Sequence, residues 1–332
     1  MTVTQWVHAY WVSRLIYVVA KLGIADLLKD GSQHCDALAA ATNTHSDSLY
    51  RVLRALASIG IFAETQSRYF ELTPLADCLQ SDIPGSIRAM TILRGEEHYY
   101  KSWGNLMYSV ETGENAFEDL YGMDLFEYNE QNPIRGKIFD EAISSSKNAY
   151  AHAQFIEAYD FSSIDKLVDI GGGKGRLLAA ILQAYPTMKG VLFDHPDVID
   201  RAKDSLELVG ISDRCQLVGG DFFEAVPAGG DTYLLKNVLH NWNDVRAKEI
   251  LRHCHQAMKE QGRLLVIDSV IPAGNDFYLS KFMDINMLVM CPGGRERTEA
   301  EFQDLFTSTG FKLTKIIQTQ LEVSIIEAIK QE

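Results

Sequence analysis

Apolar residues recur with a helical period through the first hundred residues of the chain. Over residues 46–58 they follow the i, i+3, i+4, i+7 spacing of one helix face: Leu49, Val52, Leu53, Leu56 and Ile59. Ser46 is the expected N-cap of this helix, and Gly60 is the expected stop. Further helices are predicted over residues 6–21, 23–29 and 35–41.

Two short segments then favour extended structure. Ile61–Glu64 and Tyr69–Leu72 are separated by polar residues 65–68, which predicts a β-hairpin. Helices followed by a hairpin make a winged helix-turn-helix. We therefore expect a mostly helical N-terminal domain over residues 1–100.

The pattern changes near residue 160 to alternating strands and helices. Strands are expected over residues 166–170, 190–193, 216–218, 232–235 and 263–267, with helices over 176–184, 196–208 and 245–258. A final strand pair is expected over 311–318 and 323–329. This order predicts an α/β domain over residues 101–332 with a Rossmann-like parallel sheet, preceded by aromatic-rich helices over 101–160.

Composition narrows the possible partners. Of 332 residues, 46% are hydrophobic, which is enough for a sizeable core, and the net charge of −14 disfavours nucleic acid and anionic lipid. Residues 1–100 hold eight Lys/Arg against ten Asp/Glu, so the winged helix is expected to serve dimerisation and not DNA binding. Polar His8, Ser13 and Arg14 interrupt the first apolar stretch, so no membrane span is expected.

The five cysteines are scattered and form no C-x-x-C pair. Scattered thiols are typical of a reduced compartment, so a cytoplasmic protein is expected. The sequence His253-Cys254-His255 resembles a metal-binding pattern, but residues at i and i+2 of a helix point apart. No metal is expected.

A glycine-rich turn follows the first strand of the α/β domain. It reads D-x-G-x-G-x-G from Asp169, with Gly171 and Gly173 as its first two glycines. The dinucleotide pattern G-x-G-x-x-G would need glycine at position 176 or 174, where the chain has Arg176 and Lys174. An acid ahead of the turn would repel a pyrophosphate and suits an amino group. The motif therefore favours S-adenosylmethionine (SAM) and disfavours a nicotinamide oxidoreductase.

Two more acids follow the next two strands. Asp194 is placed to accept hydrogen bonds from a ribose diol. Asp221, after Gly220, is placed to accept from the adenine amino group, with Phe222 against the ring face. The carboxyl ends of parallel strands meet at one edge of a sheet, so all three acids point to one crevice.

His240 follows the fourth strand, at the same edge. A phenol has a pKa near 10, so methylation at neutral pH benefits from a base, and histidine can accept a proton near pH 7. His240 is therefore the candidate base.

Several motifs together resemble the class I SAM-dependent small-molecule O-methyltransferases that carry an N-terminal winged-helix dimerisation domain. They lie at 49–62, 167–175, 219–223, 239–242 and 293–298. The resemblance covers nearly the whole chain. It implies a homodimer formed through the N-terminal domain and SAM as methyl donor, with S-adenosylhomocysteine (SAH) as product. It also implies a hydroxylated aromatic or polyketide-like substrate.

The resemblance also implies roles for individual residues. His240 corresponds to the catalytic base, Asp268 and Glu296 to the acids that orient it, and Lys236 to a cofactor-contacting lysine. Substrate-lining positions correspond to Phe139, Ile143, Met283, Asn286, Met287 and Met290. The family usually has glutamate at 268 and aspartate at 241, where this chain has Asp268 and Asn241.

Two alternatives remain open at this stage. The same base could deprotonate an amine or a carbon acid, which would give N- or C-methylation. The second alternative is a SAM-binding regulator whose winged helix binds DNA. The intact His240–Glu296 set and the N-terminal charge disfavour this alternative.

Overall fold

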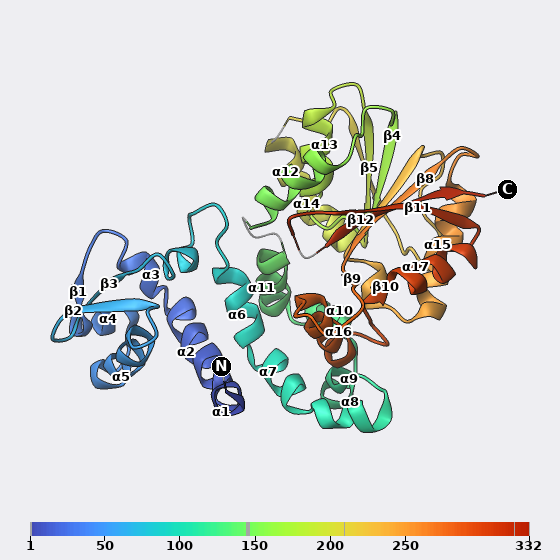
Figure 1. The fold of residues 1–332 in the computed structure, drawn as a ribbon. Coiled ribbons are helices and arrows are strands. Elements are labelled where there is room, and N and C mark those ends of the chain that lie inside the picture. Colours follow the sequence, from blue (N-terminus) through green and yellow to red (C-terminus); the bar gives the residue numbers. More distant parts are fainter. Residues whose placement is uncertain (1, 144–146, 209, 322, 332) are drawn as a thin grey trace. The chain divides into compact units, whose positions relative to one another are not determined.

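The computed structural model describes residues 2–143, 147–208, 210–321 and 323–331, and it divides into two compact units. Met1–Lys101 and Phe126–Tyr150 form the first unit, and Ser102–Leu125 and Ala151–Glu332 form the second (Figure 1). In this division the segment 126–150 groups with the N-terminal residues, and the domain bounds expected from the sequence stay a prediction.

The first unit is mostly helical, as its sequence period predicts. Its elements are α1 (Val3–Val7), α2 (Ala9–Leu22), α3 (Ile24–Leu27), β1 (Gln33–His34), α4 (Cys35–Thr42), α5 (Ser46–Ala57), β2 (Phe62–Gln66), β3 (Tyr69–Leu72), a 3₁₀ turn (Asp77–Leu79), α6 (Arg88–Gly95) and α11 (Pro133–Ile143). The helices α7 (Glu97–Gly104), α10 (Leu125–Gln131) and α12 (Lys147–Ala158) cross the unit boundaries. The apolar face of α5, with Leu49, Leu53 and Leu56 buried, packs in one core with Phe62 and Phe70 of the hairpin.

Several local predictions for this unit are wrong. The helix expected over 6–21 is two helices, α1 and α2, which meet at His8. The helix expected over 23–29 is only α3, which begins after Gly23, its N-cap with a left-handed φ of 68°, and ends at Leu27. The N-cap of α5 is His45, whose side chain accepts from the backbone of Ser48, so Ser46 is already helical.

The second unit contains a seven-stranded sheet in the order β11-β12-β8-β7-β4-β5-β6. Its strands are β4 (Lys166–Ile170), β5 (Lys189–Asp194), β6 (Cys215–Gly219), β7 (Thr232–Lys236), β8 (Arg263–Asp268), β11 (Phe311–Gln318) and β12 (Ser324–Lys330). The five strands β8 to β6 are parallel, and β12 pairs antiparallel with both of its neighbours. The predicted α/β sheet is confirmed, with a mixed edge.

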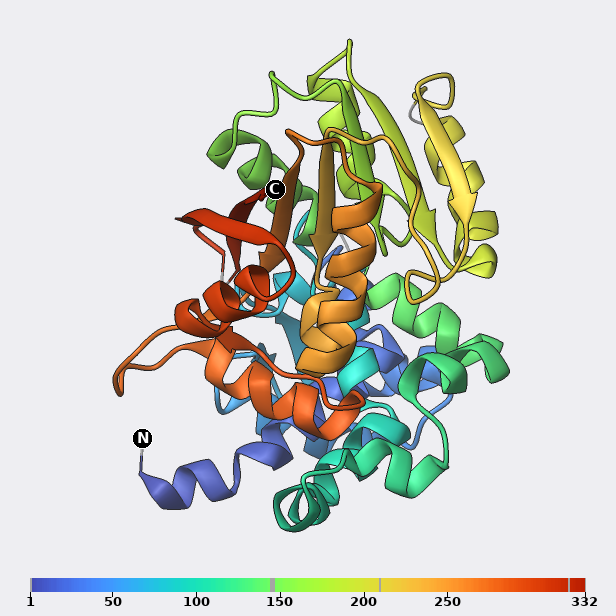
Figure 2. The same ribbon diagram turned by 90° about the vertical axis from the view of Figure 1, so that its right-hand side faces the viewer.

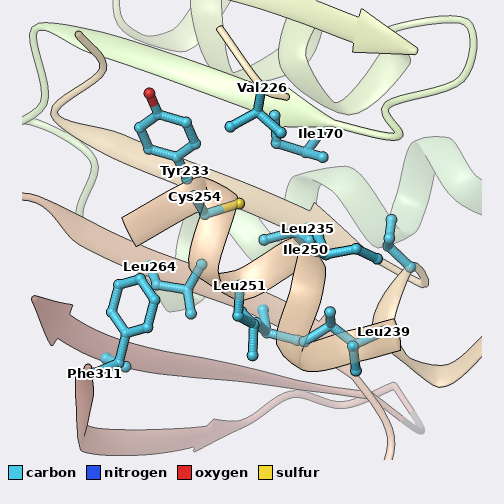
Figure 3. Packing of buried hydrophobic residues seen from close by; sticks show 14 of the residues in the cluster. Ile170, Val226, Tyr233, Leu235, Leu239, Ile250, Leu251, Cys254, Leu264 and Phe311 are labelled. Atoms are coloured by element: carbon cyan, nitrogen blue, oxygen red, sulfur yellow. The ribbon is translucent and has the colours of Figure 1, made fainter. Parts of the chain in front are cut away.

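Side chains of the strands alternate between two cores, one on each face of the sheet. Leu167, Leu192 and Leu234 pack with the helices α12 (Lys147–Ala158), α13 (Arg176–Ala184) and α14 (Pro196–Leu208). The strand residues between them, such as Val168 and Leu235, pack with α15 (Asp244–Ala257) and α17 (Glu299–Thr307). Figure 2 shows α15 against the sheet, and Figure 3 shows the side chains of this second core. Two-sided burial explains why these strands read as continuous apolar runs.

The second unit contains several further short elements. They are α8 (Leu106–Thr112), α9 (Ala116–Tyr121), the 3₁₀ turn Leu239–Asn241, α16 (Leu279–Met290) and the short parallel pair β9 (Val270–Ile271) and β10 (Arg297–Thr298). The helix α16 packs against both α8 and α9. Across the described ranges, none of the helices combines the length and the hydropathy needed to cross a bilayer.

Candidate active site

The glycine turn after β4 has a backbone that glycine adopts readily. Gly171 and Gly173 have φ values of 67° and 59°, in the left-handed region that costs other residues energy. A Cβ atom on Gly171 would also lie 2.8 Å from Cγ2 of Val238. The turn thus brings bare backbone to the start of α13, as the motif predicts.

Asp194, the last residue of β5, is tied to this turn. Its Oδ2 accepts from the backbone N–H of Gly173 at 2.8 Å, and its Oδ1 accepts from the N–H of His195 at 2.7 Å. Burial raises the pKa of Asp194, and the two backbone hydrogen bonds oppose that rise. Each carboxylate oxygen keeps a further lone pair, which is what recognition of a diol requires.

Asp169 is buried at the end of β4. Its Oδ1 accepts no hydrogen bond from any described residue. Burial raises the pKa of Asp169 to about 7, against the lowering effect of the Lys236 charge. A buried carboxyl oxygen without a partner is costly, so an added cationic donor would be stabilised here. The site therefore fits the ammonium group of SAM.

Asp221 and Phe222 lie just past β6. The Oδ1 of Asp221 accepts from the backbone of Phe223, and the side chain remains exposed. The ring of Phe222 lies close to Gly171, at 3.9 Å from a Cβ built there, and its carbonyl oxygen is 2.9 Å from Nδ1 of His253. The described geometry thus brings the turns after β4, β5 and β6 to one edge of the sheet.

His240 lies in the 3₁₀ turn that follows β7. Its Nδ1 is 2.9 Å from Oε1 of Glu296. A carboxylate accepts the Nδ1 proton, which leaves Nε2 as the acceptor nitrogen. Burial lowers the pKa of His240, but the Glu296 hydrogen bond and the charges of Asp268 and Glu296 raise it overall above its ordinary value.

The residue that orients His240 is itself held by its neighbours. The backbone N–H of Glu296 donates to Oδ1 of Asp284 at 2.9 Å, and the N–H of Arg295 donates to the carbonyl oxygen of His240 at 2.8 Å. Nothing in the local sequence pattern marked Asp284 for this role, because the contact joins α16 to a turn twelve residues later.

Asp268, at the end of β8, is fully buried, and neither of its carboxyl oxygens has a hydrogen-bond partner among the described residues. Burial raises its pKa to about 7, and the charge of His240 opposes that rise. Asp268 therefore acts on His240 through charge and not through a direct hydrogen bond. Its side chain is one methylene shorter than the glutamate usual in the family.

Lys236 ends β7, between the strands that carry Asp169 and Asp268. Burial lowers its pKa, while the charges of these two carboxyls raise it. The side chain of Asn241 is bonded within the chain: its Nδ2 donates to the carbonyl oxygen of Asn237, and its Oδ1 accepts from the thiol of Cys291.

Four predicted substrate-lining residues share one stripe of α16. They are Met283, Asn286, Met287 and Met290, of which the last two are buried. The Oδ1 of Asn286 accepts from Nε1 of Trp103 at 3.1 Å, a contact that the sequence did not indicate. Phe139 and Ile143 lie on α11, in the first unit, and their role as lining residues stays a prediction.

The apparent metal motif is used structurally. The thiol of Cys254 is buried in the core, His253 bonds to Phe222, and Nε2 of His255 is 3.2 Å from the carbonyl oxygen of Gln331. Within the part of the chain that the structure describes, no cluster of three or more ligating side chains is arranged to hold a metal ion.

The fold and the arrangement of acids, glycines and histidine define a class I methyltransferase, and comparison with known proteins gives the family. Residues 103–312 match the model of the O-methyltransferase domain, and residues 4–82 match that of the O-methyltransferase dimerisation domain. The chain belongs to this family and is a SAM-dependent O-methyltransferase with a dimerisation domain.

Relatives of known function match over almost the full length. Phenazine O-methyltransferase PhzM of Lysobacter antibioticus is 44% identical over 98% of this chain and 94% of its own. The 8-amino-8-demethylriboflavin N,N-dimethyltransferase of Streptomyces davaonensis is 37% identical over 92% of this chain and 88% of its own.

Solved structures agree with this assignment. The crystal structure of LaPhzM has a TM-score of 0.94 at 43% identity, covering 99% of this chain and 98% of that one. CalO1, a methyltransferase in calicheamicin biosynthesis solved in its SAH-bound form, has a TM-score of 0.85 at 33% identity, covering 99% and 97%.

Proposed function

We propose that this enzyme methylates a hydroxyl group of a small aromatic or polyketide-like molecule, with His240 as general base. The observation that carries the proposal is the hydrogen bond between Nδ1 of His240 and Oε1 of Glu296. It fixes the tautomer whose Nε2 can receive a proton from a substrate hydroxyl.

The residues at this edge of the sheet would each bind a different part of SAM. Asp169 would hold the ammonium group, Asp194 the ribose diol, and Asp221 and Phe222 the adenine, with Gly171, Gly173 and Gly220 allowing close approach and Lys236 nearby. When bound, SAM supplies a methyl group on a sulfonium centre, which needs an aligned nucleophile and little else.

The chain's own contribution to the reaction is then positional and electrostatic. Nε2 of His240 accepts the hydroxyl proton as the oxygen becomes nucleophilic. Glu296 keeps the ring oriented and stabilises the imidazolium through its charge, and Asp268 adds a second negative charge without direct contact. No metal ion is needed for these roles.

The nature of the substrate is supported by the chemistry of α16 and by the relatives. Met283, on the stripe of α16 that also holds the buried Met287 and Met290, offers an apolar, adaptable contact for a flat ring. The phenazine enzyme and the flavin enzyme named above both act, by their names, on fused aromatic rings. The second of them is an N-methyltransferase, so methylation of an aromatic amine by the same base is the alternative function.

We also propose a homodimer formed through the N-terminal unit. The helix α1 and the start of α2 expose large apolar side chains, which are Val3, Trp6, Val7, Tyr10 and Trp11. An exposed apolar patch of this kind is typical of an interface, and the match to the dimerisation domain covers these residues from position 4. A reduced, cytoplasmic setting would suit the five free cysteines.

The direct test is mass spectrometry of reactions with SAM and a panel of phenols, hydroxyquinones, hydroxyindoles and aromatic amines. We expect one hydroxyarene to gain one methyl group with release of SAH. Gain of methyl only on amines would favour the alternative, and no gain on any hydroxyl would contradict the proposal.

A further inference from the structure

One polar contact on α16 fixes the direction of an amide. Nε1 of Trp103 lies 3.1 Å from Oδ1 of Asn286. An indole N–H can only donate, so the oxygen of the amide must face the indole and the NH₂ group must face the other way. No described residue accepts a hydrogen bond from this Nδ2. Asn286 therefore presents a donor of fixed orientation.

The helix that carries this donor also contacts the residue that holds His240. Asn286 shares a helix stripe with Met283 and Met290, while Asp284, on an adjacent face of α16, accepts the backbone N–H of Glu296. Glu296 in turn holds His240. One short helix thus positions the general base from one face and carries an oriented amide on the next.

The chemistry of the amide restricts what this donor can bind. An NH₂ group needs an acceptor, and a ring carbonyl or an aromatic ring nitrogen of the substrate satisfies it. The charges around this part of the site are of both signs, since Arg295 acts on Asp284 and Lys236 acts on His240.

We propose that Asn286, oriented by Trp103, is a specificity-determining residue that selects hydroxyarenes carrying a second hydrogen-bond acceptor. Its Nδ2 donates a hydrogen bond to that acceptor, while His240 receives the proton of the reacting hydroxyl. The inference rests on the proposed function, since it places the substrate ring between α16 and His240.

Binding to the SAH-loaded protein tests this selection without requiring turnover. The probes are 6-hydroxyquinoline and 2-naphthol, which share the two-ring frame and the position of the hydroxyl and differ in the ring nitrogen. Wild-type protein should bind the hydroxyquinoline about 2- to 12-fold more tightly, the range expected for one net hydrogen bond. Titration calorimetry gives both dissociation constants.

Three variants separate the donor from its surroundings. Asn286→Leu removes the donor, and Asn286→Asp keeps the oxygen that faces Trp103 but replaces the NH₂ group. Both should reduce the preference to about 1, with little change in naphthol binding. Trp103→Phe removes the indole donor and should reduce the preference partly, because the amide can then rotate.

A failure of this inference can be told apart from a failure of the proposed function. A wild-type preference near 1, or a preference that survives both Asn286 variants, overturns the inference. A preference that disappears in the Asn286 variants supports the inference even if neither probe gains a methyl group. Absence of methylation on every hydroxyarene would instead count against the proposed function.

Discussion

The guanidinium of Arg297 donates two hydrogen bonds to one carboxylate oxygen of Asp244, from Nε at 3.0 Å and from Nη2 at 2.8 Å. The same guanidinium, which is 1% exposed, donates to the carbonyl oxygens of Leu239 and Trp242. These carbonyls lie on either side of His240 in the chain. His240 is therefore held by backbone that a buried cation ties to the start of α15.

Replacing Arg297 with methionine should destabilise the protein and slow methyl transfer. The change removes the buried donors that Arg297 supplies to the carbonyls of Leu239 and Trp242, which costs about 2–3 kcal/mol of unfolding free energy. Urea denaturation measures this loss. Arg295→Met is the matched control, because the ion pair of Arg295 with Glu301 is partly exposed and should contribute less than about 1 kcal/mol. Equal losses in the two variants would contradict the role of Arg297.

Binding of SAH should release a proton near neutral pH. Burial raises the pKa of Asp169 to about 7 in the free protein, whereas an ammonium partner favours the ionised carboxylate. SAH affinity should therefore increase as the pH rises from about 6 to about 8, through the raised pKa. Calorimetry in two buffers of different ionisation enthalpy measures the proton release. Asp169→Asn should abolish the pH dependence, and an unchanged dependence would contradict the assignment.

The same shift has a consequence for folding stability. The folded pKa of Asp169 lies above the ordinary carboxyl value of 3.8, so between these values the folded state holds a proton that the unfolded state has lost. This group therefore favours folding most at low pH, and its contribution falls as the pH rises toward 7.

The sequence predicted the elements whose signals are local. The strand 166–170 and the helices 176–184 and 196–208 match β4, α13 and α14 at both ends, because apolar runs and helical periods act over a few residues. These local signals do not indicate which strands pair when they are far apart in the sequence. The short strand β1 is defined by its bonds to β3, more than thirty residues later, and it was not expected.

In the candidate site, too, the sequence predicted features with a local signal and missed contacts between distant residues. Asp169, Asp194 and His240 each follow a strand, so their common edge could be inferred from topology alone. The hydrogen bond from Trp103 to Asn286 spans 183 positions, and the bond from Glu296 to Asp284 depends on how a turn packs on α16. Such contacts are set by tertiary packing, which the pattern of one chain does not specify.

The protein should be a dimer in solution at micromolar concentration. Trp6 and Trp11 are 59% and 53% exposed on the N-terminal helices, and a partner chain would bury them. Light scattering should give about 74 kDa, twice the chain mass of 37.2 kDa. Trp11→Lys should weaken the dimer by placing a charge in the apolar contact. A wild-type mass near that of one chain would contradict this account.

The Glu296→Gln variant should move the acid limb of the pH–rate profile to lower pH. Burial lowers the pKa of His240, but Glu296 and Asp268 raise it overall, so the wild-type limb is expected above the ordinary value of 6.5. Removing the charge of Glu296 should lower the pKa of His240 and make it a weaker base. The measurement is kcat/KM between pH 5 and 9. A limb that stays in place or moves upward would show that Glu296 does not set this pKa.

The most direct test of His240 as the base is the turnover of His240→Ala on a substrate whose hydroxyl pKa exceeds about 9. Such a hydroxyl is protonated at neutral pH, so alignment alone should not compensate for a missing base. Turnover should fall about 10²- to 10⁴-fold, while SAH affinity changes little. His255→Ala, which removes a histidine far along α15 from the base, should retain wild-type turnover. If His240→Ala keeps wild-type turnover from pH 6 to 9, His240 is not the general base.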